Sequence, residues 1–135
     1  MSTQIFLNLA VKDLNRSVAF FSRLGFRFDQ NYTDENATCM VVGDNIFVML
    51  LVESFFRSFT GKQLCDTSTS QEAMTAISVG SRAQVDEMAD RALEAGATSI
   101  GAPQDHGWMY TRGFEDLDGH HWEFMFMDQG ASADA

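Results

Sequence analysis

In residues 4–29, the spacing of apolar side chains changes from a strand pattern to a helix pattern and back to a strand pattern. Residues 4–11 are apolar and rich in strand-forming residues, which predicts a strand. Residues 13–25 carry apolar side chains at helical spacing, with Asp13 as a helix cap and Gly25 as the residue that ends the helix. Residues 26–29 alternate between apolar and charged side chains. The pattern therefore predicts strand, helix, strand.

Residues 37–52 contain two β-prone runs on either side of the turn sequence Gly43-Asp44-Asn45. Such an arrangement is typical of a β-hairpin. The second run is apolar at both alternating sets of positions, as in a strand that is covered on both faces. Together with the preceding elements, the hairpin completes a βαβββ module over residues 4–52.

The second half of the chain repeats this order. Residues 73–79 predict a strand, and residues 81–96 predict a helix that begins with a Ser81–Gln84 capping box. A short strand at 97–100 and two strands within 107–127 follow. The predicted fold class is therefore α+β, with two tandem βαβββ modules in one domain spanning residues 1–135. We expect module two at 73–127 and a frayed tail at 128–135.

The segment between the modules, residues 53–72, has two alternative interpretations. Residues 53–59 have the pattern of a short amphipathic helix, and the rest is polar. Connections of this length are often functional, so the segment could be a lid over a pocket. Alternatively, it is a plain linker whose phenylalanines fill a gap in the core.

Composition and charge exclude several classes of partner. The formal net charge is −10, and the nine basic residues are scattered, which argues against nucleic-acid binding. We find no export signal and no apolar run that would span a bilayer, so we expect a cytoplasmic protein with no membrane partner. The two cysteines, Cys39 and Cys65, fit reduced thiols.

Two motifs resemble a known superfamily. The sequence "VKDLNRSVAFFSRLGF" opens the first module, and "FEDLDGHHWEFMF" closes the second. With the tandem modules, they resemble the glyoxalase, bleomycin-resistance and extradiol-dioxygenase superfamily, the vicinal oxygen chelate fold. Within it, the chain looks most like small bacterial predicted lactoylglutathione lyases. The resemblance implies a cupped mixed sheet around a cavity, and a homodimer.

The resemblance also implies four metal-ligand positions. They fall on Phe6, Met49, Met74 and Glu123. Phenylalanine has no donor atom and a thioether suits soft metals, so only Glu123 keeps a ligand for a hard divalent ion. We therefore expect no cofactor, with a divalent metal at Glu123 as the open alternative.

Alternation along residues 120–127 assigns side chains to two faces. His121, Glu123, Met125 and Met127 share one face, which we expect to line the cavity. Trp122, Phe124 and Phe126 share the other, which we expect under the helices, while His120 should be exposed beside the turn. His121 and Glu123 are neighbours on their face. They form a candidate ligand-anchoring pair, or a catalytic acid–base pair.

The other expected cavity residues are mostly methionines and aromatic residues, which fit a small, partly apolar ligand. Arg112 is the candidate for attracting an anionic ligand. The remaining candidates are Phe6, Asn8, Phe47, Met49, Met74, Ala76, Ser78, Trp108, Met125, and Tyr110 or Met109. The alternative is that these side chains fill the cup and leave no pocket.

Three functions remain open. The first is metal-free binding of a small molecule, as in the bleomycin-resistance proteins that the chain resembles. The second is a metal-dependent lyase or isomerase of the lactoylglutathione lyase type, or a dioxygenase-like relative, in which Glu123 moves a proton. The third is a regulatory or structural dimer. Whether the chain is an enzyme stays open at this point.

Overall fold

The computed structural model describes residues 2–128. The chain divides into two compact units, Met1–Cys65 (unit one) and Asp66–Ala135 (unit two). The predicted frayed tail lies outside the described residues, apart from Asp128.

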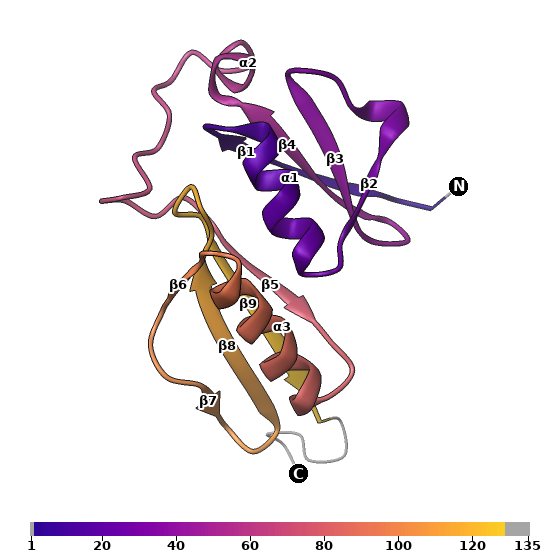
Figure 1. Ribbon diagram of the computed structural model, residues 1–135, viewed down its shortest axis with the longest axis vertical. Coiled ribbons are helices and arrows are strands. Elements are labelled where there is room, and N and C mark those ends of the chain that lie inside the picture. Colours follow the sequence, from indigo (N-terminus) through magenta and orange to yellow (C-terminus); the bar gives the residue numbers. More distant parts are fainter. Residues whose placement is uncertain (1, 129–135) are drawn as a thin grey trace. The chain divides into compact units, whose positions relative to one another are not determined.

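Unit one contains a four-stranded sheet with one helix along a face of it (Figure 1). Strand β1 pairs in parallel with β4, and β3 pairs antiparallel with β4 and β2, which gives the order β1-β4-β3-β2. The elements are β1 (Ile5–Val11), α1 (Leu14–Arg23), β2 (Arg27–Asp29), the 3-10 turn η1 (Gln30–Tyr32), β3 (Ala37–Gly43), β4 (Ile46–Val52) and α2 (Glu53–Arg57).

Unit two repeats this arrangement. Its elements are β5 (Met74–Ser78), α3 (Arg82–Glu94), β6 (Thr98–Ser99), β7 (Gln104–Asp105), β8 (Met109–Glu115) and β9 (His121–Met127). The order β5-β9-β8-β6 matches that of unit one, and the outer pair β5–β9 is again parallel. The predicted tandem βαβββ modules are confirmed. Strand β7, which pairs with β8, was not predicted.

The core of unit one lies between α1 and one face of its sheet. Asp13 caps α1 by accepting a hydrogen bond from the amide of Arg16, as predicted. Phe20 and Phe21 are buried, together with Leu9, Val11, Leu24, Met40, Val48 and Leu50. Each such side chain contributes about 1.5–3 kcal/mol when it is removed from water. Among the described residues, no helix is long and apolar enough to cross a membrane.

The core of unit two lies under α3. Trp122 and Phe124 of β9 are buried, as their alternation predicted, and Phe114 of β8 stacks on Phe124 with ring centroids 5.7 Å apart. The facing side chains of α3 are small: Val85, Ala89 and Ala92 are buried. Large aromatic rings on the sheet thus pack against small residues on the helix, which lets the helix approach closely.

The turn between β8 and β9 is organised around the buried carboxylate of Asp116. This carboxylate accepts hydrogen bonds from the amides of Asp118 and His120 and from the indole N–H of Trp122. His120 is also buried, and its Nδ1 lies 2.8 Å from Glu72 Oε1. The prediction that His120 is exposed was wrong, because Glu72 and Asp116 provide polar neighbours for a buried imidazole.

Two residues of the connecting segment also contact this turn. Thr67 donates a hydrogen bond to the carbonyl of Asp118, and Glu72 reaches His120. Gly119 has a φ of 83°, and a Cβ at this position would lie 2.7 Å from Thr67 Oγ1. Glycine is therefore required here both by conformation and by space. Residues 66–72 are thus an integral part of unit two.

Replacing Asp116 with Asn should lower stability in a pH-dependent way. The amide keeps only one acceptor oxygen for three donors, so we expect a loss of about 1–3 kcal/mol. Burial raises the pKa of Asp116, and His120 with the hydrogen bonds only partly opposes this effect. A raised folded-state pKa contributes stability in full below the unfolded value of about 3.9, and this contribution disappears as pH rises through the folded value.

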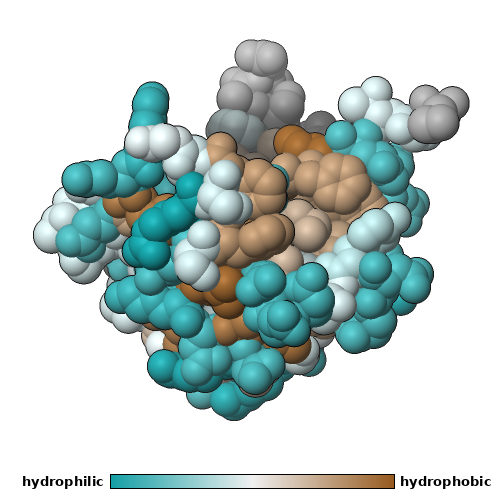
Figure 2. Space-filling view, turned by 90° about the horizontal axis from the view of Figure 1, so that it is seen from above, coloured by the Kyte–Doolittle hydropathy of each residue, from teal (hydrophilic) through white to brown (hydrophobic). Residues whose placement is uncertain are grey.

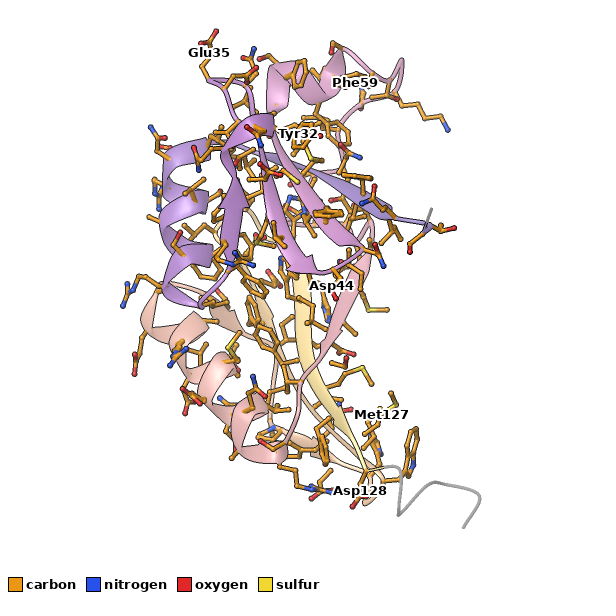
Figure 3. All side chains as sticks on the ribbon, turned by 90° about the vertical axis from the view of Figure 1, so that its right-hand side faces the viewer. Tyr32, Glu35, Asp44, Phe59, Met127 and Asp128 are labelled. Carbon is orange, nitrogen blue, oxygen red and sulfur yellow. The ribbon has the colours of Figure 1, made fainter. Side chains whose placement is uncertain are left out.

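The loss in the free energy of unfolding of Asp116→Asn should therefore be largest near the unfolded-state pKa and should become smaller as the pH rises. Urea unfolding of both proteins from roughly pH 4 to pH 8 measures it. Asp44→Asn, in the exposed β3–β4 turn labelled in Figure 3, is the matched control and should show little change. A deficit that grows with pH would contradict the prediction.

Candidate functional site

The open face of the unit-two sheet, opposite α3, carries the predicted polar pair. Strand register sets His121 between Met74 of β5 and Glu115 of β8. Glu123, two residues further along β9, lies between Ala76 and Gly113. On this face, His121 therefore has large or charged neighbours on the adjacent strands, whereas the neighbours of Glu123 have very small side chains.

The small neighbours leave a niche at Glu123. A Cβ added at Gly113 would meet Glu123 Cβ at 3.9 Å and Ile100 Cβ at 3.8 Å, so a larger side chain there would fill space beside the carboxylate. Ala76 adds only a methyl group on the other side. The Glu123 side chain keeps 35% of its surface exposed. Its carboxylate is thus accessible to a small ligand from the open face.

His121 lies beside this niche with hydrogen-bonding capacity to spare. Its Nε2 is 3.7 Å from Glu123 Oε2, which is beyond hydrogen-bond range. The same nitrogen is buried and has no hydrogen-bond partner among residues 2–128. Buried ring nitrogens normally find a partner. The pair therefore combines an accessible carboxylate with a neighbouring imidazole nitrogen that is shielded from solvent.

Tyr110 and Arg112 do not belong to this face, which corrects the prediction. They pair with Phe126 and Phe124, so they lie on the α3 side of the sheet. The Tyr110 hydroxyl donates to Asp86 Oδ1 at 2.6 Å, a hydrogen bond that raises the pKa of Tyr110. Arg112 Nη1 lies 2.9 Å from Asp90 Oδ1. The guanidinium is therefore neutralised by helix α3 and is not directed to an anionic ligand on the open face.

The remaining predicted residues of unit two are divided between the open face and its border. Met109 and Met125 lie on the open face, in register with Met127 and Thr111. Of the two alternatives Tyr110 and Met109, it is therefore Met109 that lies on the open face. Trp108 is half-buried just before β8, and its carbonyl accepts a hydrogen bond from the amide of Asp128. A role for these residues in ligand binding stays a prediction.

The open face of unit one is apolar and holds all four residues predicted for it. Phe6 and Phe47 stack with ring centroids 4.9 Å apart and planes at 15°. Asn8 is paired in register with Met49 in the next row. Cys39 lies beyond Met49 on β3, and burial, with the charge of Asp29, raises the pKa of this thiol. The place of Cys39 on this face was not predicted.

A pocket of about 440 Å³ opens at the α2 end of this face. Asn8 and Leu51 of the sheet and Phe56, Phe59 and Thr60 of the connecting segment line it. Only Asn8 among these five was a predicted ligand contact. The pattern of residues 53–59 predicts a short helix, which α2 confirms. Whether the segment acts as a lid over this pocket or as a plain linker stays a prediction.

The four metal-ligand positions implied by the resemblance hold Phe6, Met49, Met74 and Glu123. Phe6 and Phe47 form an aromatic stack where a ligand would be needed, and Met49 and Met74 offer only thioether sulfur. No group of three or more His, Cys, Asp or Glu side chains within residues 2–128 is arranged to hold a metal ion. These residues do not fit a hard divalent ion, which prefers oxygen and nitrogen donors.

Comparison with solved structures gives several close matches in fold. Hypothetical protein SA1046 from S. aureus is 28% identical, with 93% of this chain and 95% of that chain covered and a TM-score of 0.81. A glyoxalase/bleomycin resistance protein/dioxygenase family enzyme from Burkholderia phytofirmans is 15% identical, over 93% and 99% of the two chains, with a TM-score of 0.77. The fosfomycin resistance protein FosX from Listeria monocytogenes is 18% identical, over 97% and 98%, with a TM-score of 0.66.

No curated protein matches the sequence. The matching family model covers residues 4–124 and therefore both βαβββ modules, including the Asp13-capped helix and the strand that carries Glu123. The chain belongs to the Glyoxalase/Bleomycin resistance protein/Dioxygenase superfamily.

Proposed function

We propose that this protein binds a small, partly apolar molecule on the open faces of its sheets, without the divalent metal of its family. The observation that carries the proposal is the contrast between the four family ligand positions. Three hold Phe6, Met49 and Met74, whereas Glu123 is kept in an accessible niche beside His121. A carboxylate in such a niche suits recognition of a ligand's donor groups better than coordination of an ion that has lost its other ligands.

The chemistry of the open faces supports this ligand class. On the open face of unit two, the exposed thioether side chain of Met74, together with Met109 and Met125, offers adaptable apolar contact area. Glu123, beside His121, supplies a polar group of the kind that fixes orientation in small-molecule sites. The ligand should therefore combine an apolar body with at least one N–H or O–H donor.

A lyase or isomerase of the lactoylglutathione lyase type is the second candidate, and one observation favours it. Glu123 Oε2 lies 3.7 Å from His121 Nε2, so the accessible carboxylate that would move a proton has an imidazole beside it. In this protein such a reaction would have to proceed without the family's set of ligands at Phe6, Met49 and Met74. Binding therefore remains the preferred proposal, with a homodimer as the expected assembly.

Metal analysis tests the metal-free part of the proposal. Protein purified without added metal should contain divalent metal well below one equivalent by elemental analysis. Added Zn²⁺, Mn²⁺ or Ni²⁺ should give no saturable rise in melting temperature, because a ligand stabilises only when it binds the folded state. Stoichiometric metal that is lost in Glu123→Ala, but kept in the control Glu94→Ala on α3, would overturn the proposal.

Glu123→Gln tests the role of the carboxylate. The change keeps shape but removes charge, so compounds that donate a hydrogen bond to Glu123 should bind more weakly by about 1.5–3 kcal/mol. The compounds are the hits of a thermal-shift screen of small aromatic molecules with N–H or O–H groups, and titration calorimetry gives their Kd. Glu94→Gln serves as the control. Equal affinities for wild type and Glu123→Gln across all hits would contradict the prediction.

A further inference from the structure

The pocket at the α2 end of unit one has the size and lining of a ligand subsite. Its volume of about 440 Å³ lies within the range of roughly 300–1,000 Å³ that is typical of small-molecule sites. Leu51 forms part of its wall and is 3% exposed. Phe56 of α2 and Phe59, which follows the end of this helix, supply aromatic surface to the lining. The pocket is formed entirely by residues of unit one.

Phe59 is unusual because an aromatic ring is exposed at the border of an apolar pocket. It keeps 70% of its surface exposed, and its ring meets Phe55 edge-on at 5.0 Å. Figure 3 shows Phe59 beside the turn that follows α2. Figure 2 looks from the end at which α2 lies in Figure 1 and shows an apolar area bordered by hydrophilic residues. The free face of the Phe59 ring is therefore available to stack on a flat ligand.

Two polar groups of the pocket have unused hydrogen-bonding capacity. Asn8 Nδ2 donates to the carbonyl of Phe6 at 3.2 Å, and no hydrogen bond to Asn8 Oδ1 is present among residues 2–128. Thr60 Oγ1 accepts from the amide of Lys62 at 3.1 Å, so its hydroxyl hydrogen can be donated elsewhere. The pocket thus offers an acceptor at Asn8 and a donor at Thr60.

The charge of the site restricts the ligand. None of the five lining residues carries a charge, and the whole chain has a net charge of −10. An anion would therefore lose its hydration without gaining a cation as partner, which is costly in an apolar pocket. A neutral ring meets no such penalty.

We propose that this pocket is a subsite for an uncharged, flat aromatic ring that carries an N–H donor. The ring stacks on Phe59 and packs against Leu51, and its N–H donates to Asn8 Oδ1. This inference rests on the proposed function and deepens it, because it gives the chemical class of a ligand group on the open face of unit one. It also gives a role to the phenylalanines of the connecting segment.

Titration of the full chain with three matched probes tests this inference. Indole is flat and neutral and carries an N–H group, 1-methylindole lacks the donor, and indole-3-acetate adds a negative charge. By calorimetry, indole should bind saturably, 1-methylindole about threefold to tenfold more weakly, and indole-3-acetate without detectable saturation. Failure of indole to saturate, or tighter binding of the anion, would overturn the subsite.

Variants then test the two contacts. Phe59→Ala should weaken indole binding about threefold to tenfold, since it removes one stacking face. Tyr32→Ala is the matched control: Tyr32 is a similarly exposed aromatic residue of unit one, at 64%, which does not line the pocket (Figure 3). Asn8→Ala should abolish the preference for indole over 1-methylindole. Equal losses in Phe59→Ala and Tyr32→Ala, or a preserved preference in Asn8→Ala, would refute the assignment.

Methyl NMR separates this inference from the proposed function. Indole should shift the methyl signals of Leu51 and Thr60, and Glu123→Gln should leave those shifts unchanged. Binding that shifts Met125, which neighbours Glu123, but not Leu51 would refute the subsite and leave the proposed function standing. Conversely, Leu51 shifts in a protein whose screen ligands ignore Glu123→Gln would support the subsite while the proposed role of Glu123 fails.

Discussion

The parallel pairing of the first and last strands in each unit is the constraint on which the rest of the structure depends. It fixes Phe6 opposite Phe47 in unit one, and Ala76 opposite Glu123 in unit two. Because side chains alternate along a strand, a slip of one residue would exchange the buried and open faces completely. Burial of Trp122 and Phe124 under α3 opposes such a slip, so the packing of the core keeps Glu123 on the open face.

The same register sets the surroundings of two of the family's ligand positions. The family position at Phe6 is occupied by a ring that stacks on its neighbour Phe47, which gives this residue a packing role. On β9, the neighbours of Glu123 are the smallest available, Ala76 and Gly113. Space beside the carboxylate is therefore created by residues with almost no side chain. A ligand group can enter this space, and the carboxylate stays half-exposed to meet it.

Alternation predicted the faces of β1 and β9 correctly because each strand has one clear set of buried apolar residues. Strand β4 is apolar at both sets of positions, so the face of Phe47 and Met49 followed instead from the ligand position that the family resemblance implies. Alternation failed on β8, where both sets contain large side chains, so Tyr110 and Met109 could not be distinguished from sequence. The pairing register of β8 with β9 across the Asp116–Gly119 turn decides which residues of β8 face α3. It places Tyr110 and Arg112 on that side, where they contact Asp86 and Asp90. No local pattern reveals such partners, because they are contributed by a helix more than twenty residues earlier in the chain.

His120 was mispredicted for a similar reason. Next to a glycine turn, a histidine is usually solvated, but here Glu72 from the connecting segment comes within 2.8 Å of its ring. For residues 53–72, the sequence left a lid over a pocket and a plain linker as alternatives, because an amphipathic pattern predicts a helix without predicting what the helix covers. Both cases involve tertiary contacts of residues 53–72, which is the part of the chain with the least regular hydrophobic period.

Residues 53–72 also contribute side chains to the α2 pocket and to the turn that precedes His121 and Glu123. The first part of this segment supplies Phe56 and Phe59 to the pocket of unit one, and its second part supplies Thr67 and Glu72 to the turn before β9. That turn directly precedes His121, so its hydrogen bonds determine where β9 begins and hence which residues of β9 face Ala76 and Gly113. A segment that only connected two modules would need none of these contacts. Its side chains instead help to form the α2 pocket and to fix the turn before β9.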